Sequence, residues 1–515
     1  MAVTAVSPQD DGTRPPSALQ PTTMTLATLH ANYLRALGAP LPTSVIETWS
    51  VTRDGLTGTL VVTVRGDDKR EDEQLGAELH TADGVVGGRS WQQNENGEIT
   101  YPTGVHRRAE IDAAALRSGA PGVALLGMLA EEPARYVVRV DPPGGRLEYV
   151  YFDSSTFLID QIDEALEGTR VIFTFDGYRN VGGRMVAGHV HTIVARTGIE
   201  GDRVLRSSEV DSPPHDDALA MPTPASPLSA AHFPVELPAR ILSDRIILKT
   251  RIKNRPVNLQ LDSGASAIAI DTGVIDALGI PKIGASKGTM AGTYSVSQAI
   301  VPELQIGDVS LHNVAVYAIP FVELADEHTP VAGLIGFDFL NTAVFKIDYV
   351  KGTVTALDPA TFTPPSGAFE QDIALDDNVP MLSATIGNAT GKTFVLDTGA
   401  DRSAIYSPFR LAHPDAVADQ GLGTRLRDAF PFETQFTGVG GQVTYHPVQV
   451  RPFTFGGVTF SSWLFDATYN AASFEGEDND GLIGQDVLRY FDLYLDYPHS
   501  RIYFVPNSRY VDRFG

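Results

Sequence analysis

Residues 258–270 read NLQLDSGASAIAI, and residues 393–406 read TFVLDTGADRSAIY. In both stretches an apolar strand pattern leads into Asp-Ser/Thr-Gly-Ala, and a second apolar stretch follows. The two aspartates, Asp262 and Asp397, are 135 positions apart. A segment that recurs in this way indicates an internal repeat. The second half of the chain is therefore predicted to contain two copies of one structural unit.

The repeat extends beyond the two aspartates. The motif GLIG occurs at 333–336 and again at 481–484, and each copy is followed by a short helical pattern and a strand that ends in Asp-Tyr. The stretch between the copies, PATFTPPSG, has the composition of a linker. We therefore expect a first lobe at residues 233–358, a linker at 359–367 and a second lobe at 368–515.

The first half of the chain shows mainly strand patterns. Residues 1–22 are rich in Pro, Ser, Asp and Thr and are predicted to form a flexible tail. Residues 23–210 are expected to form a β-rich accessory domain, because apolar and polar residues alternate in stretches such as TGTLVVTVRG. Helical patterns cover residues 25–37 and the region near 111–130, and residues 211–232 read as a linker. The fold class predicted for the whole chain is mainly β.

Composition excludes several classes of function. The net charge of −24 argues against a nucleic-acid partner and against binding to an anionic membrane surface, because both require basic residues. The chain has no Cys, which excludes disulfides, thiolate metal sites and a Cys nucleophile. No apolar stretch approaches 18 residues, so we expect no transmembrane segment.

The sequence leaves the cellular compartment open. The first residues, MAVTAVSPQDDGTRPPSALQPTT, have neither the basic region nor the apolar region of a signal peptide. The protein would be periplasmic or secreted if a signal peptide has been removed, and cytoplasmic otherwise.

The repeated aspartates suggest a specific chemistry. If the two copies pack about a two-fold axis, Asp262 and Asp397 face one another and share one proton, because two adjacent carboxyls cannot both ionise. The ionised member would act as a general base on water, and the protonated member would polarise a carbonyl group. Such a pair hydrolyses an acyl bond without a metal or a cofactor, so we expect neither.

The residues beside each aspartate have expected supporting roles. Gly264 and Gly399 permit a tight turn that brings backbone N–H groups close to each carboxylate. The hydroxyls of Ser263 and Thr398 are expected to bond across to the opposite loop.

These motifs resemble the aspartic peptidases, and each copy is most similar to one subunit of a retroviral-type protease. The resemblance covers roughly residues 240–510 and includes LDSGAS, LDTGAD, LIGFDFL and LIGQDVL. It implies two closed β-barrel lobes and endopeptidase activity on a peptide or protein substrate. Because both aspartates lie in one chain, as in pepsin-like enzymes, it also implies catalysis by a monomer. The chain differs from pepsins in having short lobes and no disulfides.

The family closes its cleft with glycine-containing hairpins, called flaps, between the aspartate and GLIG motifs. GTMAGTY at 288–294 and GVGG at 438–441 lie at the corresponding places. Tyr294 is the candidate for the tyrosine of a pepsin-type flap. The resemblance therefore implies that substrate-binding flap residues include Gly288, Gly292, Tyr294, Gly438, Gly440 and Gly441.

Two further residues follow the aspartate motifs. By resemblance, the Ser266 hydroxyl would bond the catalytic carboxylate. Its counterpart Asp401 occupies a place where retroviral enzymes carry an Asp that meets the substrate backbone. A surface turn residue is the alternative interpretation.

A third Asp-Thr-Gly begins at Asp271, but the other repeat has no counterpart to it. It precedes the helical pattern GVIDALG, so we interpret it as a helix N-cap rather than a catalytic residue. Asp338 and Asp486, which follow the GLIG motifs, are interpreted as structural.

No metal site is predicted. The pairs His189/His191 and His446/His499 lack ligand spacing with acidic partners, and packed or solvated histidines are the preferred interpretation. The acidic run EGEDND at 475–480 offers oxygen ligands for Ca²⁺ but lacks the EF-hand loop pattern, so a solvated loop is preferred.

The N-terminal half is similar to half-barrel domains of the lipoprotein-carrier type, in LEYVYFD and FTFDGYRNVGGRMVAGHV. This similarity implies a curved sheet around helices that holds an apolar ligand, whereas the alternative is an accessory domain that positions substrate or shields the cleft. Two functions other than proteolysis therefore stay open. They are a non-catalytic peptide-binding module on the protease fold and an apolar-ligand carrier.

Overall fold

The computed structural model describes most of the chain. The described residues are 14–514 apart from gaps at 41, 102–114, 117, 119–120, 167–168, 196, 212–213, 215–216, 243–244, 290–292, 322, 327–328, 418–433, 439–440 and 468–478. The chain is mainly β, with 55% strand and 12% helix. It divides into two compact units, Met1–Pro224 with Gly284–Ser286, and Ala225–Ile283 with Lys287–Gly515.

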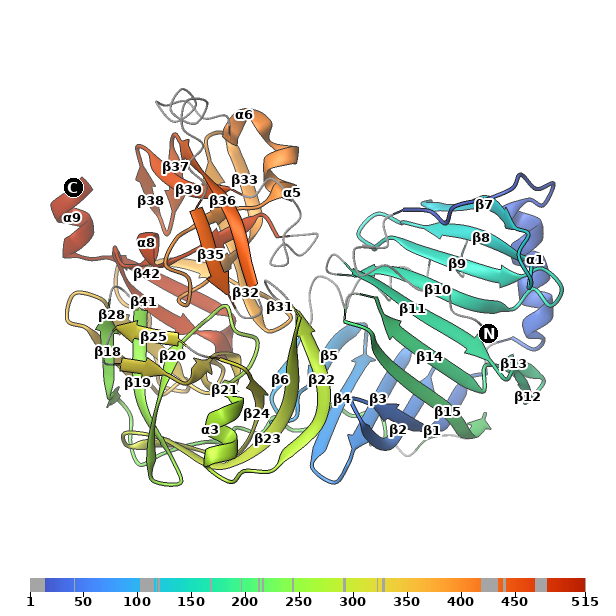
Figure 1. Cartoon of the computed structure of the whole chain (residues 1–515), viewed down its shortest axis with the longest axis horizontal. Coiled ribbons are helices and arrows are strands. Elements are labelled where there is room, and N and C mark those ends of the chain that lie inside the picture. The colour runs from blue at the N-terminus through green and yellow to red at the C-terminus, as the bar shows by residue number, and fades with distance from the viewer. Residues whose placement is uncertain are drawn as a thin grey trace. The chain divides into compact units, whose positions relative to one another are not determined.

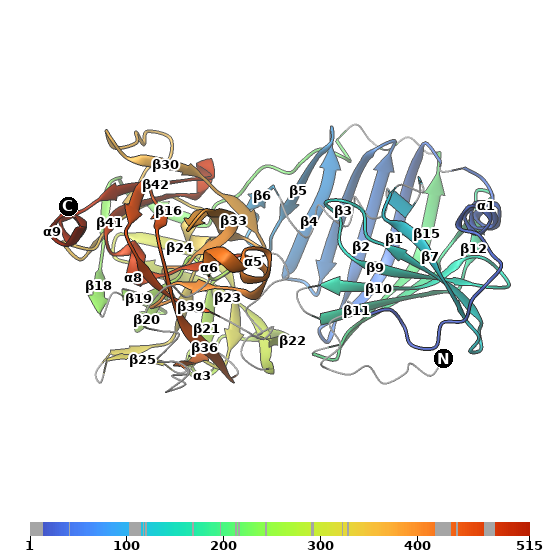
Figure 2. The same ribbon diagram turned by 90° about the horizontal axis from the view of Figure 1, so that it is seen from above.

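The N-terminal unit is built on one antiparallel sheet of 13 strands, in the order β6-β5-β4-β3-β2-β1-β15-β14-β11-β10-β9-β8-β7. The sheet curls, so that β3 to β5 and β9 to β11 run in different directions (Figure 2). Its strands are β1 (Ser44–Arg53), β2 (Leu56–Arg65), β3 (Asp68–Leu75), β4 (Leu79–Val86), β5 (Arg89–Gln93), β6 (Ile99–Thr100), β7 (Val123–Leu129), β8 (Arg135–Val140), β9 (Glu148–Asp153), β10 (Ile159–Leu166), β11 (Thr169–Asp176), β14 (His189–Val194) and β15 (Ile199–Val210).

Helix α1 (Leu26–Leu37) covers part of one face of this sheet (Figure 1). Thr25 caps the helix by accepting a hydrogen bond from the Thr28 N–H, and Leu29 packs against Val138, Val150 and other buried residues of the sheet. The helix predicted over residues 25–37 is thus confirmed. A small hairpin of β12 (Arg179–Val181) and β13 (Arg184–Val186) adjoins the helix.

The helix expected near residues 111–130 is wrong in its C-terminal part, because residues 123–129 form strand β7. Pairing of β7 with β8 satisfies its backbone groups and outweighs the helix preference of a Leu-rich stretch. Gly127 also suits a strand at this position, since a Cβ there would lie 2.6 Å from the Gln20 carbonyl oxygen. An apolar run of this length is ambiguous between helix and strand in sequence alone.

The C-terminal unit contains two sheets with corresponding strand orders, one for each repeat. The first sheet runs β16-β24-β21-β27-β20-β19-β23-β22, with β18 beside β19. Its strands are β16 (Leu228–Ala230), β18 (Ala239–Leu242), β19 (Arg245–Ile252), β20 (Arg255–Leu261), β21 (Ala269–Asp271), β22 (Lys282–Thr289), β23 (Thr293–Ile306), β24 (Val309–Ile319) and β27 (Gly333–Ile335). Helices α3 (Thr272–Ala277) and α4 (Phe337–Leu340) and the hairpin of β25 (Glu323–Asp326) and β26 (Thr329–Val331) complete this lobe.

The second sheet runs β35-β36-β39-β34-β40-β33-β32-β37-β38, with β31 beside β32. Its strands are β31 (Ala374–Asp376), β32 (Val379–Ile386), β33 (Ala389–Leu396), β34 (Ala404–Ile405), β35 (Thr434–Gly438), β36 (Gly441–Val450), β37 (Phe453–Phe455), β38 (Val458–Phe460), β39 (Trp463–Ala467) and β40 (Gly481–Ile483). The helices of this lobe are α5 (Ser407–Ala412), α6 (Pro414–Val417), α8 (Gln485–Leu488), the 3₁₀ helix η1 (Tyr497–His499) and α9 (Ser508–Phe514).

The two repeats share their strand pairings. Each aspartate strand, β20 or β33, runs parallel to the GLIG strand, β27 or β40. A third sheet joins the lobes in the order β17-β29-β28-β41-β42-β30, with three strands from each repeat. These are β17 (Val235–Leu237), β28 (Val344–Asp348), β29 (Thr353–Leu357), β30 (Phe369–Asp372), β41 (Phe491–Asp496) and β42 (Arg501–Pro506).

One hydrophobic core extends through both lobes. It includes Leu261 and Leu396 at the ends of the two aspartate strands, and Ile347 and Leu493, which pair across the β28–β41 contact. All four side chains are fully buried. Continuous burial of this kind fixes the lobes against each other within one unit, and with them the two aspartate motifs. No helix among the described residues is long and apolar enough to cross a membrane.

Candidate active site

The structure brings Asp262 and Asp397 together. Each follows the last residue of a buried strand, and its backbone N–H donates to a carbonyl of the adjacent GLIG strand. These bonds run from Asp262 to Ile335 at 3.1 Å and from Asp397 to Ile483 at 3.0 Å. The two carboxyls lie within hydrogen-bonding reach of each other, and a hydrogen bond between them requires that one of them carries a proton. The pairing predicted from the repeat is therefore present in the geometry.

A reciprocal hydroxyl network holds the two aspartate loops together. The Ser263 N–H donates to the Thr398 hydroxyl at 3.0 Å, and the Thr398 N–H donates to the Ser263 hydroxyl at 2.9 Å. Each hydroxyl then donates to a carbonyl of the opposite strand, from Ser263 to Leu396 at 2.6 Å and from Thr398 to Leu261 at 3.1 Å. Both side chains are fully buried. The four bonds thus fix the distance between the loops that carry the carboxyls.

The two glycines allow the carboxyls to approach. A Cβ on Gly264 would lie 2.8 Å from the carboxyl carbon of Asp397, and a Cβ on Gly399 would collide with the carboxyl of Asp262. Each carboxyl therefore occupies space that only glycine leaves free on the opposite loop. The same glycines also contribute donors, since the Gly264 N–H bonds Asp262 at 2.8 Å and the Gly399 N–H bonds Asp397 at 2.7 Å.

The surroundings of the pair disfavour two negative charges. Burial, and then the charge of Asp397, raise the pKa of Asp262 well above its ordinary value. Burial also raises the pKa of Asp397, but N–H donors from Gly399 and Ala400 oppose that rise. Two nearby carboxyls with raised pKa values share a proton over a range of pH, which is the state required for paired acid and base action.

Ser266 and Asp401 contact the opposite lobe. Arg245 at the start of β19 forms a two-point ion pair with Asp401, with both N···O distances at 3.0 Å. At the corresponding place in the other repeat, the Asn378 amide lies 3.5 Å from the Ser266 carbonyl oxygen. Asp401 therefore contributes to the contact between the lobes, which its interpretation from sequence did not include. Arg245 belongs to the first lobe and Asp401 to the second, so this ion pair becomes evident only when the two repeats are packed together.

The third Asp-Thr-Gly has a structural position. The Asp271 carboxylate accepts a bond from the Val274 N–H at 3.1 Å and caps helix α3, as predicted. It also accepts a bond from the Phe321 N–H at 3.0 Å. Asp338 and Asp486 likewise accept backbone N–H groups, from Ile268 and Ser403, which stand immediately before strands β21 and β34, so both have structural contacts.

The predicted flap residues lie where each sheet extends into a hairpin, but parts of them are outside the described residues. In the first lobe β22 and β23 are neighbours, and the Tyr294 ring packs over Gly288 so closely that a Cβ there would lie 2.5 Å from it. In the second lobe β35 pairs with β36, with Gly438 opposite Gly441. Gly292 and Gly440 lie outside the described residues, and a role for these segments in binding stays a prediction.

Sequence reasoning missed three side chains that contact the aspartate loops. The Gln260 amide donates to the Gly399 carbonyl at 3.0 Å, and the Gln485 amide donates to the Thr398 carbonyl at 2.6 Å. The buried Tyr497 hydroxyl lies 3.5 Å from the Ser263 carbonyl oxygen. The sequence did contain a signal for the two glutamines. When the two repeats are aligned, Gln260 corresponds to Val395 and Gln485 corresponds to Phe337. A polar residue at a position that is apolar in the other repeat is unusual in a protein core.

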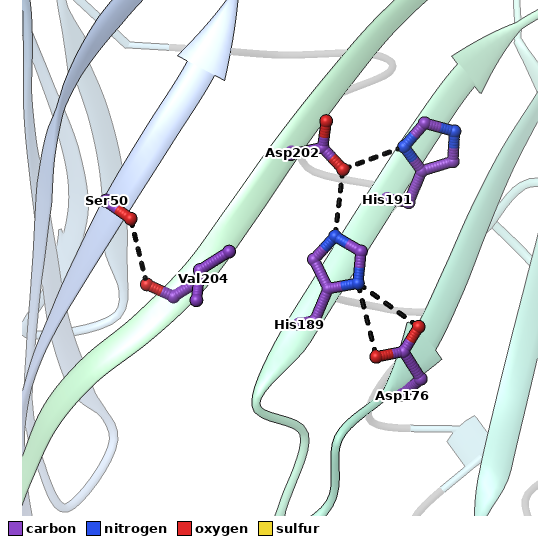
Figure 3. A network of polar contacts seen from close by, with 6 residues as sticks. All are labelled: Ser50, Asp176, His189, His191, Asp202 and Val204. Carbon is purple, nitrogen blue, oxygen red and sulfur yellow. Dashed lines mark hydrogen bonds and ion pairs between the residues drawn. The ribbon is translucent and has the colours of Figure 1, made fainter.

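The N-terminal unit contains a separate polar cluster around His189 (Figure 3). His189 Nδ1 lies 3.1 Å from Asp176, its Nε2 lies 2.8 Å from Asp202, and His191 lies 2.9 Å from the same Asp202 oxygen. Strand pairing places Asp176 and Asp202 beside this pair, and these two acidic contacts were not predicted from the sequence. Within the described ranges, no group of three or more His, Asp or Glu side chains is arranged to hold a metal ion. Most of the acidic run at 475–480 lies outside those ranges.

This cluster should stabilise the N-terminal unit only while His189 is protonated. Hydrogen bonds that His189 donates to the Asp202 and Asp176 carboxylates raise its pKa above its ordinary value of 6.5, so its contribution is complete below pH 6.5 and is lost as the pH rises through the folded-state pKa. We expect His189→Gln to lower the unfolding free energy by about 0.5–1 kcal/mol at pH 5.5, as is typical of exposed pairs, and by much less at pH 9.

Tryptophan fluorescence can measure this effect in the full chain. The chain has three Trp, so in a Trp463→Phe background the signal comes only from Trp49 and Trp91 of the N-terminal unit. Equal destabilisation at both pH values would show that His189 acts through packing rather than charge.

Comparison with known proteins gives a family match in the C-terminal half. The aspartyl protease family model matches residues 248–339 and 382–487, one segment in each lobe. A search of curated proteins found no match. Similar solved structures include an aspartic proteinase from Irpex lacteus, at 12% identity and a TM-score of 0.34, covering 53% of this chain and 98% of that chain.

Two further solved structures correspond to the N-terminal half. One is a DUF1329 family protein from Desulfovibrio piger, at 12% identity and a TM-score of 0.31, covering 38% of this chain and 98% of that chain. The other is a LolA superfamily protein from Nitrosomonas europaea, at 12% identity and a TM-score of 0.29, covering 38% and 97%. The resemblance to aspartyl proteases that the two Asp-Ser/Thr-Gly motifs predict is thus confirmed for the C-terminal half of the chain, where the family model matches both repeats.

Proposed function

We propose that this protein is an aspartic endopeptidase whose single active site is formed by Asp262 and Asp397. The observation that carries the proposal is the pair of carboxyls, which contact each other, lie against the opposing glycines and have raised pKa values. A purely structural pair of buried carboxyls would be destabilising, because burying like charges costs free energy that apolar residues would not. Such an arrangement is typical of a functional site.

The chemistry follows from one shared proton. The ionised carboxylate removes a proton from a water molecule while the water oxygen attacks the carbonyl carbon of the peptide bond. The protonated carboxyl gives its proton to the carbonyl oxygen, so a neutral tetrahedral diol forms. Proton transfer to the nitrogen and cleavage of the C–N bond then release an amine and a carboxylic acid. The pair returns to its starting state with one proton.

The direct test is proteolysis by the intact chain. A denatured protein mixture is incubated with it between pH 3 and 8, with and without a pepstatin-type inhibitor, and the products are identified by mass spectrometry. We expect new internal termini that disappear when the inhibitor is present. Binding of the inhibitor without any cleavage would instead favour a non-catalytic peptide-binding module.

We also propose that one chain suffices for catalysis. Both aspartates belong to one unit, and the β28–β41 pairing and the Ser263–Thr398 network join the lobes within it. Specific activity should therefore stay constant on dilution, and a mixture of Asp262→Asn and Asp397→Asn chains should stay inactive. Recovery of activity on mixing would show that the site combines aspartates from two chains.

A further inference from the structure

The two aspartate loops differ in what holds their carbonyl groups. In the second lobe, Gln485 donates its side-chain amide to the Thr398 carbonyl at 2.6 Å, and Gln260 reaches from the first lobe to the Gly399 carbonyl at 3.0 Å. The acceptors are carbonyl oxygens, so the NH₂ group of each glutamine must point toward the loop. Both glutamine side chains are at least 97% buried.

These two carbonyls belong to the peptide groups that bind Asp397. The Thr398 carbonyl shares its peptide group with the Gly399 N–H, which donates to Asp397 Oδ1 at 2.7 Å. The Gly399 carbonyl shares its peptide group with the Ala400 N–H, which donates to the same oxygen at 3.0 Å. A hydrogen bond accepted by a peptide carbonyl polarises the group and strengthens the bond that its N–H donates. Both amide–carbonyl bonds therefore strengthen donors that stabilise a negative charge on Asp397.

Among the described residues, the loop around Asp262 has no equivalent pair of amides. The repeat places Val395 and Phe337 at the positions that correspond to Gln260 and Gln485, and neither side chain can donate a hydrogen bond. The Ser263 carbonyl instead has the Tyr497 hydroxyl at 3.5 Å, the longest distance of the three. The two carboxyls are thus alike in sequence but unlike in the groups behind them.

The fold itself does not require the two glutamines. Their counterparts Val395 and Phe337 occupy the same places in the other repeat as apolar side chains. The Oε1 atoms of Gln260 and Gln485 are buried and have no hydrogen-bond partner among the described residues. An unsatisfied buried polar atom is destabilising, so an apolar side chain would be the more stable choice at both positions. The unfavourable burial points to a role in the site.

We propose that Gln260 and Gln485 are positioning residues that make Asp397 the ionised member of the pair and leave the shared proton on Asp262. This inference rests on the proposed function, since it assigns Asp397 as general base and Asp262 as general acid within it.

Other titratable groups near the pair do not produce this asymmetry. Asp401, four residues after Asp397, disfavours a charge on Asp397, and its own charge is paired with Arg245. Burial, and then the charges of Asp262 and Asp397, raise the pKa of Tyr497 well above its ordinary value, so it stays neutral and contributes only its hydroxyl. Backbone N–H groups of Gly264 and Ala265 bond Asp262 just as those of Gly399 and Ala400 bond Asp397, so the asymmetry comes from the glutamine amides behind the second pair of donors.

The test replaces each glutamine by methionine in the full chain, which removes the donor while keeping an unbranched side chain of similar size. The acidic limb of the pH profile of kcat/KM should move up by about 0.5 pH unit for each substitution, because a weaker donor raises the pKa of the general base. Thermal stability should be unchanged or higher, since an unpaired buried oxygen is removed with the amide.

Two further variants make the result decisive. Gln371→Met, which removes an amide–carbonyl bond to Ser383 elsewhere in the second lobe, should leave the acidic limb in place. Gln260→Val, which copies the other repeat, serves if Gln260→Met does not fold. An acidic limb that stays unchanged in both glutamine variants would overturn the inference, as would a limb that moves down.

A titration that needs no activity separates this inference from the proposed function. Carboxyl ¹³C NMR of aspartate-labelled protein, assigned with Asp262→Asn and Asp397→Asn, should show Asp397 ionising at lower pH than Asp262. The Gln260→Met and Gln485→Met substitutions should reduce that difference. An inactive chain with this order of ionisation would contradict the proposed function alone. An active chain in which Asp262 ionises first would contradict only the assignment.

Discussion

Replacing either Asp262 or Asp397 by asparagine is expected to lower kcat/KM by about 10³-fold or more, because loss of one carboxyl removes the general acid or the general base. The fold should survive, because asparagine has nearly the same size as aspartate. Burial of two neighbouring carboxyls is itself unfavourable, so replacing one of them with a neutral amide should not destabilise the protein. Initial rates of peptide cleavage, with thermal unfolding and circular dichroism as folding checks, measure both parts of this expectation.

Asp271→Asn is the matched control for this result. Asp271 begins the third Asp-Thr-Gly and caps helix α3, so its substitution should reduce stability by about 1 kcal/mol or less and leave the cleavage rate nearly unchanged. If Asp271→Asn were inactive while Asp262→Asn kept its activity, the assignment of the catalytic aspartate in the first repeat would be wrong.

Thr398→Ala is expected to have the largest effect on stability. The Thr398 hydroxyl accepts the Ser263 N–H and donates to the Leu261 carbonyl, and both of these groups are buried. Without the hydroxyl they lose their partners, at about 1–3 kcal/mol for each unsatisfied group. We therefore expect a loss of about 2–5 kcal/mol, with lower activity because the two loops are no longer held in register. The unfolding transition of the C-terminal unit, followed through Trp463 in a Trp49→Phe/Trp91→Phe background, measures the loss.

Thr398→Ser is the control that the chain itself supplies, since the first repeat has Ser263 at the same place. It keeps the hydroxyl and removes only a methyl group, so the loss should stay below about 1.5 kcal/mol. Equal losses for the Ala and Ser variants would mean that packing of the methyl group, and not the hydrogen-bond network, holds the loops.

The repeat made the central part of this structure predictable from sequence. Asp262 and Asp397 could be paired because each follows an apolar strand and precedes GLIG, and Asp271 could be set aside because it has no counterpart. The strand content of both halves followed from alternation of apolar and polar residues. These features are local or recur in the chain, so no knowledge of distant contacts was needed.

The features that sequence did not predict depend on contacts between distant residues. His189 meets Asp176 and Asp202 because β14 lies between β11 and β15, and the register of those strands cannot be read from the His-x-His spacing. Gln260 reaches the opposite lobe only once the repeats are packed. Residues 123–129 read equally well as helix or strand until β8 is placed beside them.

The central claim is that Asp262 and Asp397 act as one catalytic unit. The most direct measurement compares kcat/KM of the Asp262→Asn/Asp397→Asn double variant with that of each single variant on the same fluorogenic peptide. Members of one unit are strongly non-additive, so the double variant should be no slower than the single variants within about threefold. A double variant whose loss equals the product of the two single losses, or a single variant that keeps full activity, would contradict the account.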